Sequence, residues 1–285
     1  MKLARYRSGS DVLIGAVEGS AIAQLSGRLD GIGAHMTALI ARWGELRGAA
    51  EALRGNTDVA LSDVELLAPV GRPGKIWGIG LNYADHIEEA GLPVPKEQLW
   101  FVKAVTAVNG PYQPIQRPAA STALDYEAEM VVVVGAGGKH IPRERAADAI
   151  FGYCVGNDVS VRDWQMASGQ FSIGKSFDTH APFGPWITTA DEVANPADLM
   201  IRCYVNGEKR QESSTRHLIF DPLAQVAHLS RAMTLEPGDV FYTGTPGGVG
   251  MAMKPPVFLA PGDKVRVEID GLGFIENEVV QEHAP

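Results

Sequence analysis

The sequence has few of the features that mark several large classes of protein. Its 285 residues include only two cysteines, Cys154 and Cys203, and both lie in apolar, strand-like surroundings. We therefore expect buried, reduced thiols in a cytoplasmic protein rather than a disulfide framework. No apolar run approaches the roughly 18 residues of a membrane span. The first residues also lack the apolar core of a signal peptide.

Positive charge is also scarce. The chain has 25 Lys and Arg against 34 Asp and Glu, a net charge of −9. Such a surface disfavours nucleic acid and anionic membranes, so we expect neither as a partner. The motifs G-x-S-x-G, H-E-x-x-H and C-x-x-C are missing, which removes three common designs of active site. The 32 glycines and 18 prolines indicate a turn-rich, β-rich α+β fold.

A Gly- and Pro-rich break at 71–74 divides the chain into two predicted modules. Residues 1–70 read as a small α+β domain, with a hairpin over 12–25, a helix over 35–54 and a strand over 64–70. We find no candidate catalytic, metal-binding or substrate-binding residues in this module. Residues 71–285 are the larger predicted domain, and they contain every candidate site residue.

Acidic residues flank two apolar runs of the larger module. Residues 131–134 are four valines, which predict a buried strand, and the spacing of Glu127 and Glu129 puts both side chains on one face. Asp158 follows a second strand-like run, 151–155. Buried carboxylates need a positive partner, and oxygen ligands without nearby His or Cys suit Mg²⁺ or Mn²⁺. The alternative is two solvated glutamates on an edge strand and a turn aspartate.

His86 and Glu89 are three residues apart in a segment, 82–90, that we expect to be a short helix capped by Asn82 or Asp85. At that spacing the two side chains are within reach of each other. A glutamate that holds an imidazole fixes its tautomer and raises its basicity, as a general base requires. The alternative is an ordinary surface ion pair.

Arg162 and Gln165 follow Asp158 closely and are able to face the same site. Arginine is suited to binding a carboxylate with two parallel hydrogen bonds. The alternative for Arg162 is a salt bridge to Asp158 or Asp163. The glycine-rich segment 243–250 lets backbone N–H groups approach a ligand, and Thr245 adds a hydroxyl donor. Its alternative is a simple glycine-rich turn.

Residues 169–176 match the Walker A nucleotide-binding pattern letter for letter. A P-loop needs a buried strand before it and a helix that starts at the lysine. Here the preceding residues are polar, and Pro182 and Pro185 are incompatible with a helix that continues after the motif. We therefore reject a nucleotide site and retain Lys175 as an isolated lysine between apolar residues.

Taken together, these segments resemble the fumarylacetoacetate hydrolase family. The matching segments occur in family order between about residues 75 and 280: 80–86 (GLNYADH), 125–129 (DYEAE), 157–165 (NDVSVRDWQ), 174–178 (GKSFD), 205–208 (VNGE) and 243–246 (TGTP). Each motif is weak alone, but six in order are specific. The first 70 residues resemble the extra domain of bacterial two-module members.

The resemblance implies a β-rich fold of rolled, mixed sheets with peripheral helices, and a homodimer. It implies Mg²⁺ or Mn²⁺ on Glu127, Glu129 and Asp158, with Ca²⁺ as an acceptable substitute. It also implies that His86 and Glu89 activate a water molecule. The family's substrate-site positions fall on four more residues: Arg162, Gln165, Lys175 and Thr245. The chain lacks the fourth carboxylate ligand of the animal hydrolase that names the family, which argues against fumarylacetoacetate itself.

The main functional hypothesis is metal-dependent hydrolysis of a C–C bond in a β-diketo acid, such as an acylpyruvate or a diketo sugar acid. His86 would deprotonate the attacking water, and Lys175 would help to stabilise the expelled enolate. The first alternative is decarboxylation or keto–enol tautomerisation of an oxaloacetate-type acid at the same site. A third, of another class, is a non-catalytic protein that binds divalent metal or a metabolite.

Overall fold

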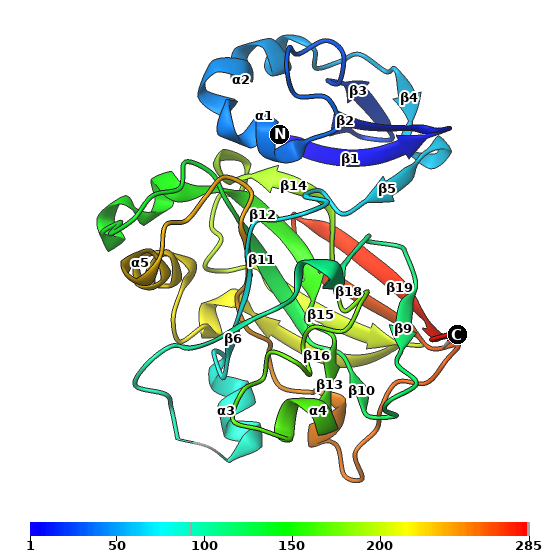
Figure 1. Cartoon of the computed structure of the whole chain (residues 1–285), viewed down its shortest axis with the longest axis vertical. Helices are drawn as coiled ribbons and strands as arrows, with labels where there is room; N and C mark the ends of the chain where they lie inside the picture. Colours follow the sequence, from blue (N-terminus) through cyan, green and yellow to red (C-terminus); the bar gives the residue numbers. More distant parts are fainter. Residues whose placement is uncertain (92, 284–285) are drawn as a thin grey trace.

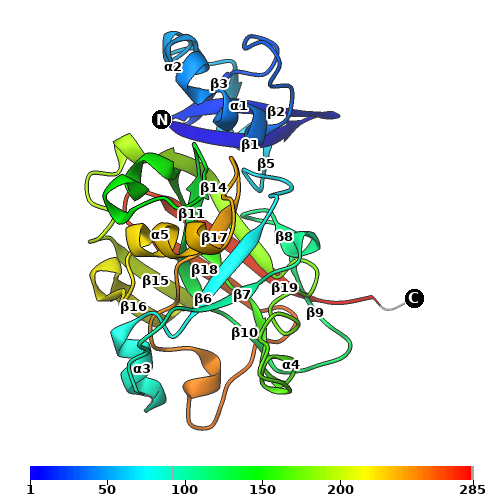
Figure 2. The same cartoon turned by 60° about the vertical axis from the view of Figure 1, so that its left-hand side comes forward.

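The computed structural model describes residues 1–91 and 93–283. Within this range the chain forms sheets of twelve, five and two strands, with short helices at their edges (Figure 1). The expected β-rich α+β fold of mixed sheets and peripheral helices is confirmed. The N-terminal elements lie at one end of the molecule, and α3 and α4 lie at the opposite end (Figures 1 and 2).

The N-terminal part combines a meander of strands with two helices. Its elements are β1 (Lys2–Ser8), β2 (Asp11–Glu18), β3 (Ala21–Gln24), α1 (Met36–Ala41), α2 (Trp43–Ala52), β4 (Val59–Ala60) and β5 (Glu65–Leu67). The predicted hairpin is confirmed as β2 and β3. The helix predicted over 35–54 is wrong as a single element, because Arg42 leaves helical backbone angles (φ −108°, ψ 16°) and ends α1. Its guanidinium bonds the carbonyl of Asp30 and the carboxylate of Glu45.

The twelve-stranded sheet runs through both predicted modules. Its main path is β4-β3-β2-β1-β14-β12-β11-β17-β6-β7, with β5 beside β1 and β8 beside β14. The strands after the N-terminal part are β6 (Ile76–Gly80), β7 (Leu99–Val102), β8 (Val108–Asn109), β11 (Ala128–Val134), β12 (Ile150–Asn157), β14 (Ala181–Thr189) and β17 (Val240–Tyr242). β1 pairs with β14 through Lys2–Thr188 and Leu3–Ile187. The proposed division between residues 70 and 71 therefore crosses one continuous sheet.

β11 is an interior strand between β12 and β17, and all seven of its residues are buried. Its side chains alternate between two hydrophobic cores, as the pleat requires. Val131 and Val133 pack into a core that also contains residues of β1, β2 and the N-terminal helices. Met130 and Val132 pack into a second core against the five-stranded sheet. Because each fully buried valine stabilises the fold by about 1.5 kcal/mol or more, this run fixes the register of the strand.

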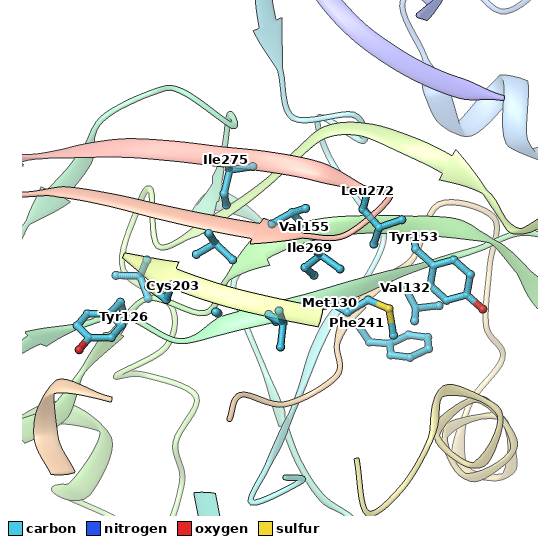
Figure 3. Close-up of a cluster of buried hydrophobic side chains, with 14 of the residues drawn as sticks. Tyr126, Met130, Val132, Tyr153, Val155, Cys203, Phe241, Ile269, Leu272 and Ile275 are labelled. Carbon is cyan, nitrogen blue, oxygen red and sulfur yellow. The ribbon is translucent and has the colours of Figure 1, made fainter. Parts of the chain in front are cut away.

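The five-stranded sheet covers the second core. It has the order β16-β15-β18-β19-β9. Its bounds are β9 (Ile115–Arg117), β15 (Met200–Val205), β16 (Glu208–Ser214), β18 (Lys264–Ile269) and β19 (Gly273–Gln281). Figure 3 shows Cys203, Ile269 and Ile275 of this sheet close to Met130 and Val155 of the larger sheet. Tight turns at 206–207 and 270–271 join β15 to β16 and β18 to β19 in antiparallel hairpins.

The peripheral helices are short. They are α3 (Ala84–Ala90), α4 (Arg162–Met166) and α5 (Pro222–Ala232). α5 starts at a side-chain cap, because the Asp221 carboxylate accepts a hydrogen bond from the backbone N–H of Ala224 at 2.8 Å. A 3₁₀ helix, Arg143–Ala149, follows Pro142, which is its N-cap. Within residues 1–91 and 93–283, no helix combines the length and apolarity needed to cross a bilayer.

The expected cap of α3 is wrong. The N-cap of this helix is Tyr83, and no side chain caps it. Asn82 is buried and binds elsewhere, since its amide group donates to the carbonyls of Phe220 and Thr243 and accepts from the N–H of Phe220. Asn82 therefore ties the start of the α3 segment to the segments that flank α5 and β17.

Candidate active site and metal centre

A two-stranded sheet positions the acidic site. β10 (Leu124–Asp125) pairs antiparallel with β13 (Ser160–Val161), and β11 pairs with β12 just beyond it. The turn after β12 is therefore held against the segment between β10 and β11. The backbone N–H of Asp158 donates to the carbonyl of Glu127 at 2.9 Å, and the amide oxygen of Asn157 accepts from the N–H of Glu127 at 2.9 Å. This frame makes the two carboxylates neighbours.

Glu127, Glu129 and Asp158 converge as the sequence predicted. One carboxylate oxygen from each lies within 4.8 Å of the other two, and all three side chains are buried. The alternative of two solvated glutamates on an edge strand is wrong, because Glu129 is 1 % exposed and Asp158 is 0 % exposed. β11 is also a central strand of its sheet rather than an edge.

Three cationic side chains bind two of these carboxylates. Lys175 Nζ donates to Glu127 Oε2 at 2.8 Å and to Asp158 Oδ2 at 2.9 Å. Arg162 donates to Glu127 Oε1 at 2.6 Å, and Lys103 donates to Asp158 Oδ1 at 2.5 Å. All four oxygens of Glu127 and Asp158 are therefore in contact with a cation of the chain.

Glu129 is in a different electrostatic position. Its Oε2 accepts from the N–H of Gly244 at 2.6 Å, and within the described part of the chain it forms no ion pair. Burial raises the pKa of Glu129, and the charges of Asp158 and Glu127 raise it further, so that it lies well above its ordinary value. Burial alone would also raise the pKa of Glu127, but Lys175 and Arg162 outweigh this effect and lower it to about 2.

The donor set fits a hard divalent cation. With all groups ionised, the cluster has four negative charges, on Asp125, Glu127, Glu129 and Asp158. It has three positive charges, on Lys103, Arg162 and Lys175. The excess negative charge lies at Glu129, because no cationic side chain of the described residues forms an ion pair with it. A buried carboxylate in that position is stabilised by a metal ion. Oxygen-only ligands favour Mg²⁺ or Mn²⁺ over Zn²⁺.

Arg162 does not form the salt bridges that the sequence suggested. Its side chain binds Asp125 at 2.8 Å and Glu127 at 2.6 Å, rather than Asp158 or Asp163. Arg162 is 4 % exposed, and its Nη2 has no hydrogen-bond partner within the described residues. A buried guanidinium nitrogen without a partner is a free donor for a substrate oxygen.

Two residues that the sequence did not single out belong to the site. Asp125 is fully buried, and besides Arg162 it accepts hydrogen bonds from the N–H groups of Gly250 and Met251 at 2.8 and 2.9 Å. Lys103 is 1 % exposed and binds Asp158. The only local signal for Lys103 was a lysine directly after an apolar strand, which solvated lysines share. Its role depends on the distant pairing that brings β7 beside the site.

His86 and Glu89 lie side by side on α3. His86 Nδ1 is 3.5 Å from Glu89 Oε2, and the two side chains are 17 % and 31 % exposed. Both oxygens of Glu89 also accept from the N–H of Gly248, at 3.0 and 3.1 Å. The glutamate is therefore anchored to the glycine-rich segment, so the pair is more than an isolated surface contact.

The remaining predicted residues are held close to this cluster. Gln165 Oε1 accepts from Arg162 Nη1 at 2.8 Å. Thr245 Oγ1 accepts from the amide of Gln211 at 2.8 Å, which also leaves its hydroxyl proton free to donate. Residues 171–175 form turns, and no helix starts at Lys175, so the Walker-like pattern lacks P-loop geometry.

These groups surround a cavity of about 180 Å³. Its polar lining is His86, Glu127, Arg162, Gln165, Lys175 and Thr245, and its apolar lining includes Ile79, Leu81, Phe101, Met166, Phe171 and Met251. The lining thus combines charged groups of the carboxylate cluster with apolar side chains, and Lys175 Nζ lies 5.1 Å from the centre of the Phe101 ring. Glu129, Asp158 and Glu89 are not part of the lining. Asp158 contacts Lys175 and Glu89 lies beside His86, both of which line the cavity, and a carboxylate oxygen of Glu129 lies within 4.8 Å of one of Glu127.

Comparison with known proteins places this site in a family. The model of the fumarylacetoacetate (FAA) hydrolase C-terminal domain matches residues 75–280, and that of an Rv2993c-like N-terminal domain matches residues 1–69. The chain is 48 % identical over 238 residues to the mitochondrial oxaloacetate tautomerase fahd2 of Xenopus laevis, an alignment that covers 82 % of this chain and 75 % of the relative.

Solved structures agree with the sequence comparison. Maleylpyruvate hydrolase from Sphingobium sp. SYK-6, in complex with manganese(II) and pyruvate, is 36 % identical with a TM-score of 0.83, and the match covers 99 % of this chain and 100 % of that one. Fumarylacetoacetate hydrolase from Exiguobacterium antarcticum is 38 % identical with a TM-score of 0.86 and the same coverage. The chain belongs to the fumarylacetoacetate hydrolase family.

Proposed function

We propose that this chain is a divalent-metal-dependent enzyme that interconverts the keto and enol forms of a small 2-oxo acid of the oxaloacetate type. The observation that carries the proposal is the cavity in which His86 faces the same space as Glu127, Arg162 and Lys175. A proton-transfer group, hydrogen-bond donors for an oxyanion and a carboxylate cluster for a cation thus share one small volume. The 48 % identity to an oxaloacetate tautomerase supports the choice of reaction.

We propose Glu127, Glu129 and Asp158 as the metal ligands, with Mg²⁺ or Mn²⁺ as the ion. When bound, the cation supplies Lewis-acid polarisation of the 2-oxo group, which makes the neighbouring C–H more acidic. The manganese(II) in the related maleylpyruvate hydrolase supports this assignment. Lys175 bridges Glu127 and Asp158, so its ammonium would share these two carboxylates with the cation.

His86 is the proposed proton carrier. Its neutral imidazole takes the proton from the carbon next to the keto group, and the same imidazole returns that proton to the oxygen, so that keto acid becomes enol without net change in charge. The carboxylate of Glu89, 3.5 Å from His86 Nδ1, lies beside the ring during both transfers and is the group that would orient it. Arg162 Nη2 and the ammonium of Lys175 are the donors available for the oxygen on which negative charge develops.

Hydrolysis of a C–C bond in an acylpyruvate is the second candidate. The apolar side chains of the lining, which include Phe101 and Phe171, suit contact with an acyl group, which oxaloacetate lacks. The likeness to a maleylpyruvate hydrolase also favours it. In that reaction His86 would deprotonate a water molecule rather than a carbon.

The test is to supply oxaloacetate and a series of acylpyruvates with Mn²⁺ or Mg²⁺, before and after chelation. Loss of the enol absorbance without carbon–carbon cleavage identifies tautomerisation, and release of pyruvate from acylpyruvates identifies hydrolysis. We expect chelation, and separately Glu129→Gln, to abolish whichever activity is found. Turnover that resists chelation would contradict the metal-dependent mechanism. Metal binding without turnover of any 2-oxo acid would show a non-catalytic binding protein.

A further inference from the structure

A second cavity, of about 240 Å³, lies beside the linker between the two predicted modules. Its lining includes Arg5 of β1, His35 and Thr37 at the start of α1, and Gly71 and Arg72 of the linker. The cavity is smaller than the roughly 300–1,000 Å³ of pockets for drug-sized ligands. It therefore suits a small molecule or ion.

The charged residues of this lining are all basic. Arg5, Arg72 and His35 contribute cationic or cation-forming groups, and no carboxylate is among the lining residues. Within residues 1–91 and 93–283, neither arginine forms a hydrogen bond or an ion pair through its side chain. Burial lowers the pKa of the half-buried Arg5, and repulsion from Arg7 lowers it further. A guanidinium in this environment is stabilised by an anion.

The backbone next to Arg5 is shaped to admit its guanidinium. A Cβ atom at Gly71 would lie 2.7 Å from Arg5 Nη1 and 2.8 Å from its Cζ. Any other residue at position 71 would therefore force the side chain of Arg5 to move. The guanidinium is held against the linker by close packing rather than by an acidic partner.

Arg7 provides a useful contrast on the same strand. It is two residues from Arg5, so both side chains leave the same face of β1. Arg7 is exposed and pairs with Glu65 at 3.0 Å. Of the two arginines, only Arg5 combines partial burial, a cavity and the lack of a counter-charge.

We propose that this cavity binds a small oxyanion, such as a phosphate or carboxylate group. The guanidinium of Arg5 would be its main ligand, and Arg72, His35 and the hydroxyl of Thr37 would complete the lining. The bound anion would join β1 and α1 of the N-terminal part to the linker that leads into β6. The site lies at the N-terminal end of the molecule, away from α3 and α4 (Figure 2). It is thus separate from the proposed active site.

The experiment measures binding of sodium phosphate and, in a second arm, sodium succinate, by calorimetry and by thermal shift against sodium chloride at equal ionic strength. Wild type is compared with Arg5→Gln, Arg72→Gln and the control Arg7→Gln, which removes the same charge from the same strand. We expect about tenfold weaker binding or more for Arg5→Gln, because a charge-assisted hydrogen bond is lost. Binding by Arg7→Gln should stay close to that of wild type.

The two arms identify the source of the ligand, because binding of phosphate alone indicates a phosphate group and binding of succinate indicates a carboxylate. If Arg5→Gln fails to fold, the exposed Arg72→Gln carries the comparison, with the same direction of effect expected. Equal affinity in wild type and both cavity variants, or no binding of either anion beyond that of chloride, would overturn the proposal. If the anions bound at the active site instead, their affinity would be the same for wild type and all three variants.

Discussion

At the scale of single residues, the site depends on how burial and neighbouring charges act on each carboxylate. Glu127 and Asp158 are surrounded by cations of the chain, whereas Glu129 has only one backbone donor. Lys175 contacts two carboxylates and its pKa is raised, because they outweigh its burial. Lys103 contacts only Asp158 and its pKa is lowered, because burial dominates. The pKa values of the two lysines in this cluster are thus shifted in opposite directions.

The proton-transfer pair gives the first residue-scale prediction. His86→Ala should reduce kcat by about 10²–10⁴, the range of a lost general base. Glu89→Gln should reduce it less, since the imidazole remains and loses only its charged neighbour at 3.5 Å. The matched control is Glu88→Gln, which alters an exposed residue of the same helix. Steady-state rates for all three variants test this, and equal rates for Glu89→Gln and Glu88→Gln would contradict the pairing.

His180 gives a prediction about acid stability. Its ring is buried, Nε2 is 2.8 Å from the carbonyl oxygen of Gln116, and burial lowers its pKa to about 3. The unfolded chain, with a histidine pKa near 6.5, therefore binds the proton first as pH falls. This group's contribution to stability should be complete above about pH 6.5 and should decline down to about pH 3. The free energy of unfolding, measured with urea across this range, should depend less steeply on pH in His180→Gln than in wild type. An equal slope in both proteins would contradict the lowered pKa of His180.

The sequence identified the three converging carboxylates of the site but neither Asp125 nor Lys103. Glu127, Glu129 and Asp158 are close in sequence to two strong strand signals, so their convergence follows from strand pairing. Lys103 and Asp125 are joined to the cluster by contacts across 55 and 37 residues. No local pattern encodes such contacts, because they depend on which strands become neighbours.

At the scale of elements, Asp125 connects three parts of the site. It lies on β10, pairs with Arg162 at the start of α4, and accepts from the N–H groups of Gly250 and Met251. The segment that carries Met251 lines the proposed substrate cavity. One buried carboxylate thus fixes both the guanidinium and one wall of the cavity.

Asp125→Asn should therefore destabilise the fold by about 3 kcal/mol or more, because it breaks a buried ion pair and leaves Arg162 short of a partner. Asp163→Asn is the matched control, since Asp163 is next to Arg162 in sequence but accepts a hydrogen bond from Ser121 instead. Asp163→Asn should change the free energy of unfolding by no more than about 1 kcal/mol. Urea denaturation measures this free energy for both variants, and similar losses of stability in the two would contradict the pairing of Asp125 with Arg162.

Strong local signals predicted the elements well. The four valines of β11 and the turn between β2 and β3 gave correct elements, because burial and turn formation act over a few residues. β1 was not expected, since its three basic residues are typical of a solvated segment. Its place depends on pairing with β14, which joins Lys2 to Thr188 over about two thirds of the chain length. The break at Arg42 was missed because apolar spacing alone does not show where a helix ends.

At the scale of the whole molecule, one sheet joins the N-terminal part to the larger part, and the two candidate sites lie toward opposite ends. The family resemblance predicted the fold class because six motifs occur in order. It did not predict that the sheet is continuous, because the pairing of β1 with β14 has no motif. The central claim concerns the end with α3 and α4, where we propose that the three converging carboxylates bind a catalytic cation.

The most direct measurement is the melting temperature of metal-free protein titrated with Mn²⁺ and Mg²⁺, for wild type, Glu129→Gln and the exposed control Glu144→Gln, over a pH series. Binding should stabilise wild type and the control by about 2.7 kcal/mol at a hundredfold excess over Kd. The stabilisation should grow with pH, because the raised pKa of Glu129 means that it gives up a proton when metal binds.

For Glu129→Gln we expect a much smaller metal-induced shift, together with a metal-free melting temperature equal to or above that of wild type, since the repulsion among three carboxylates is relieved. Equal metal-induced shifts in wild type and Glu129→Gln would show that the cluster does not hold the cation. That result would contradict the proposed metal centre and the mechanism that depends on it.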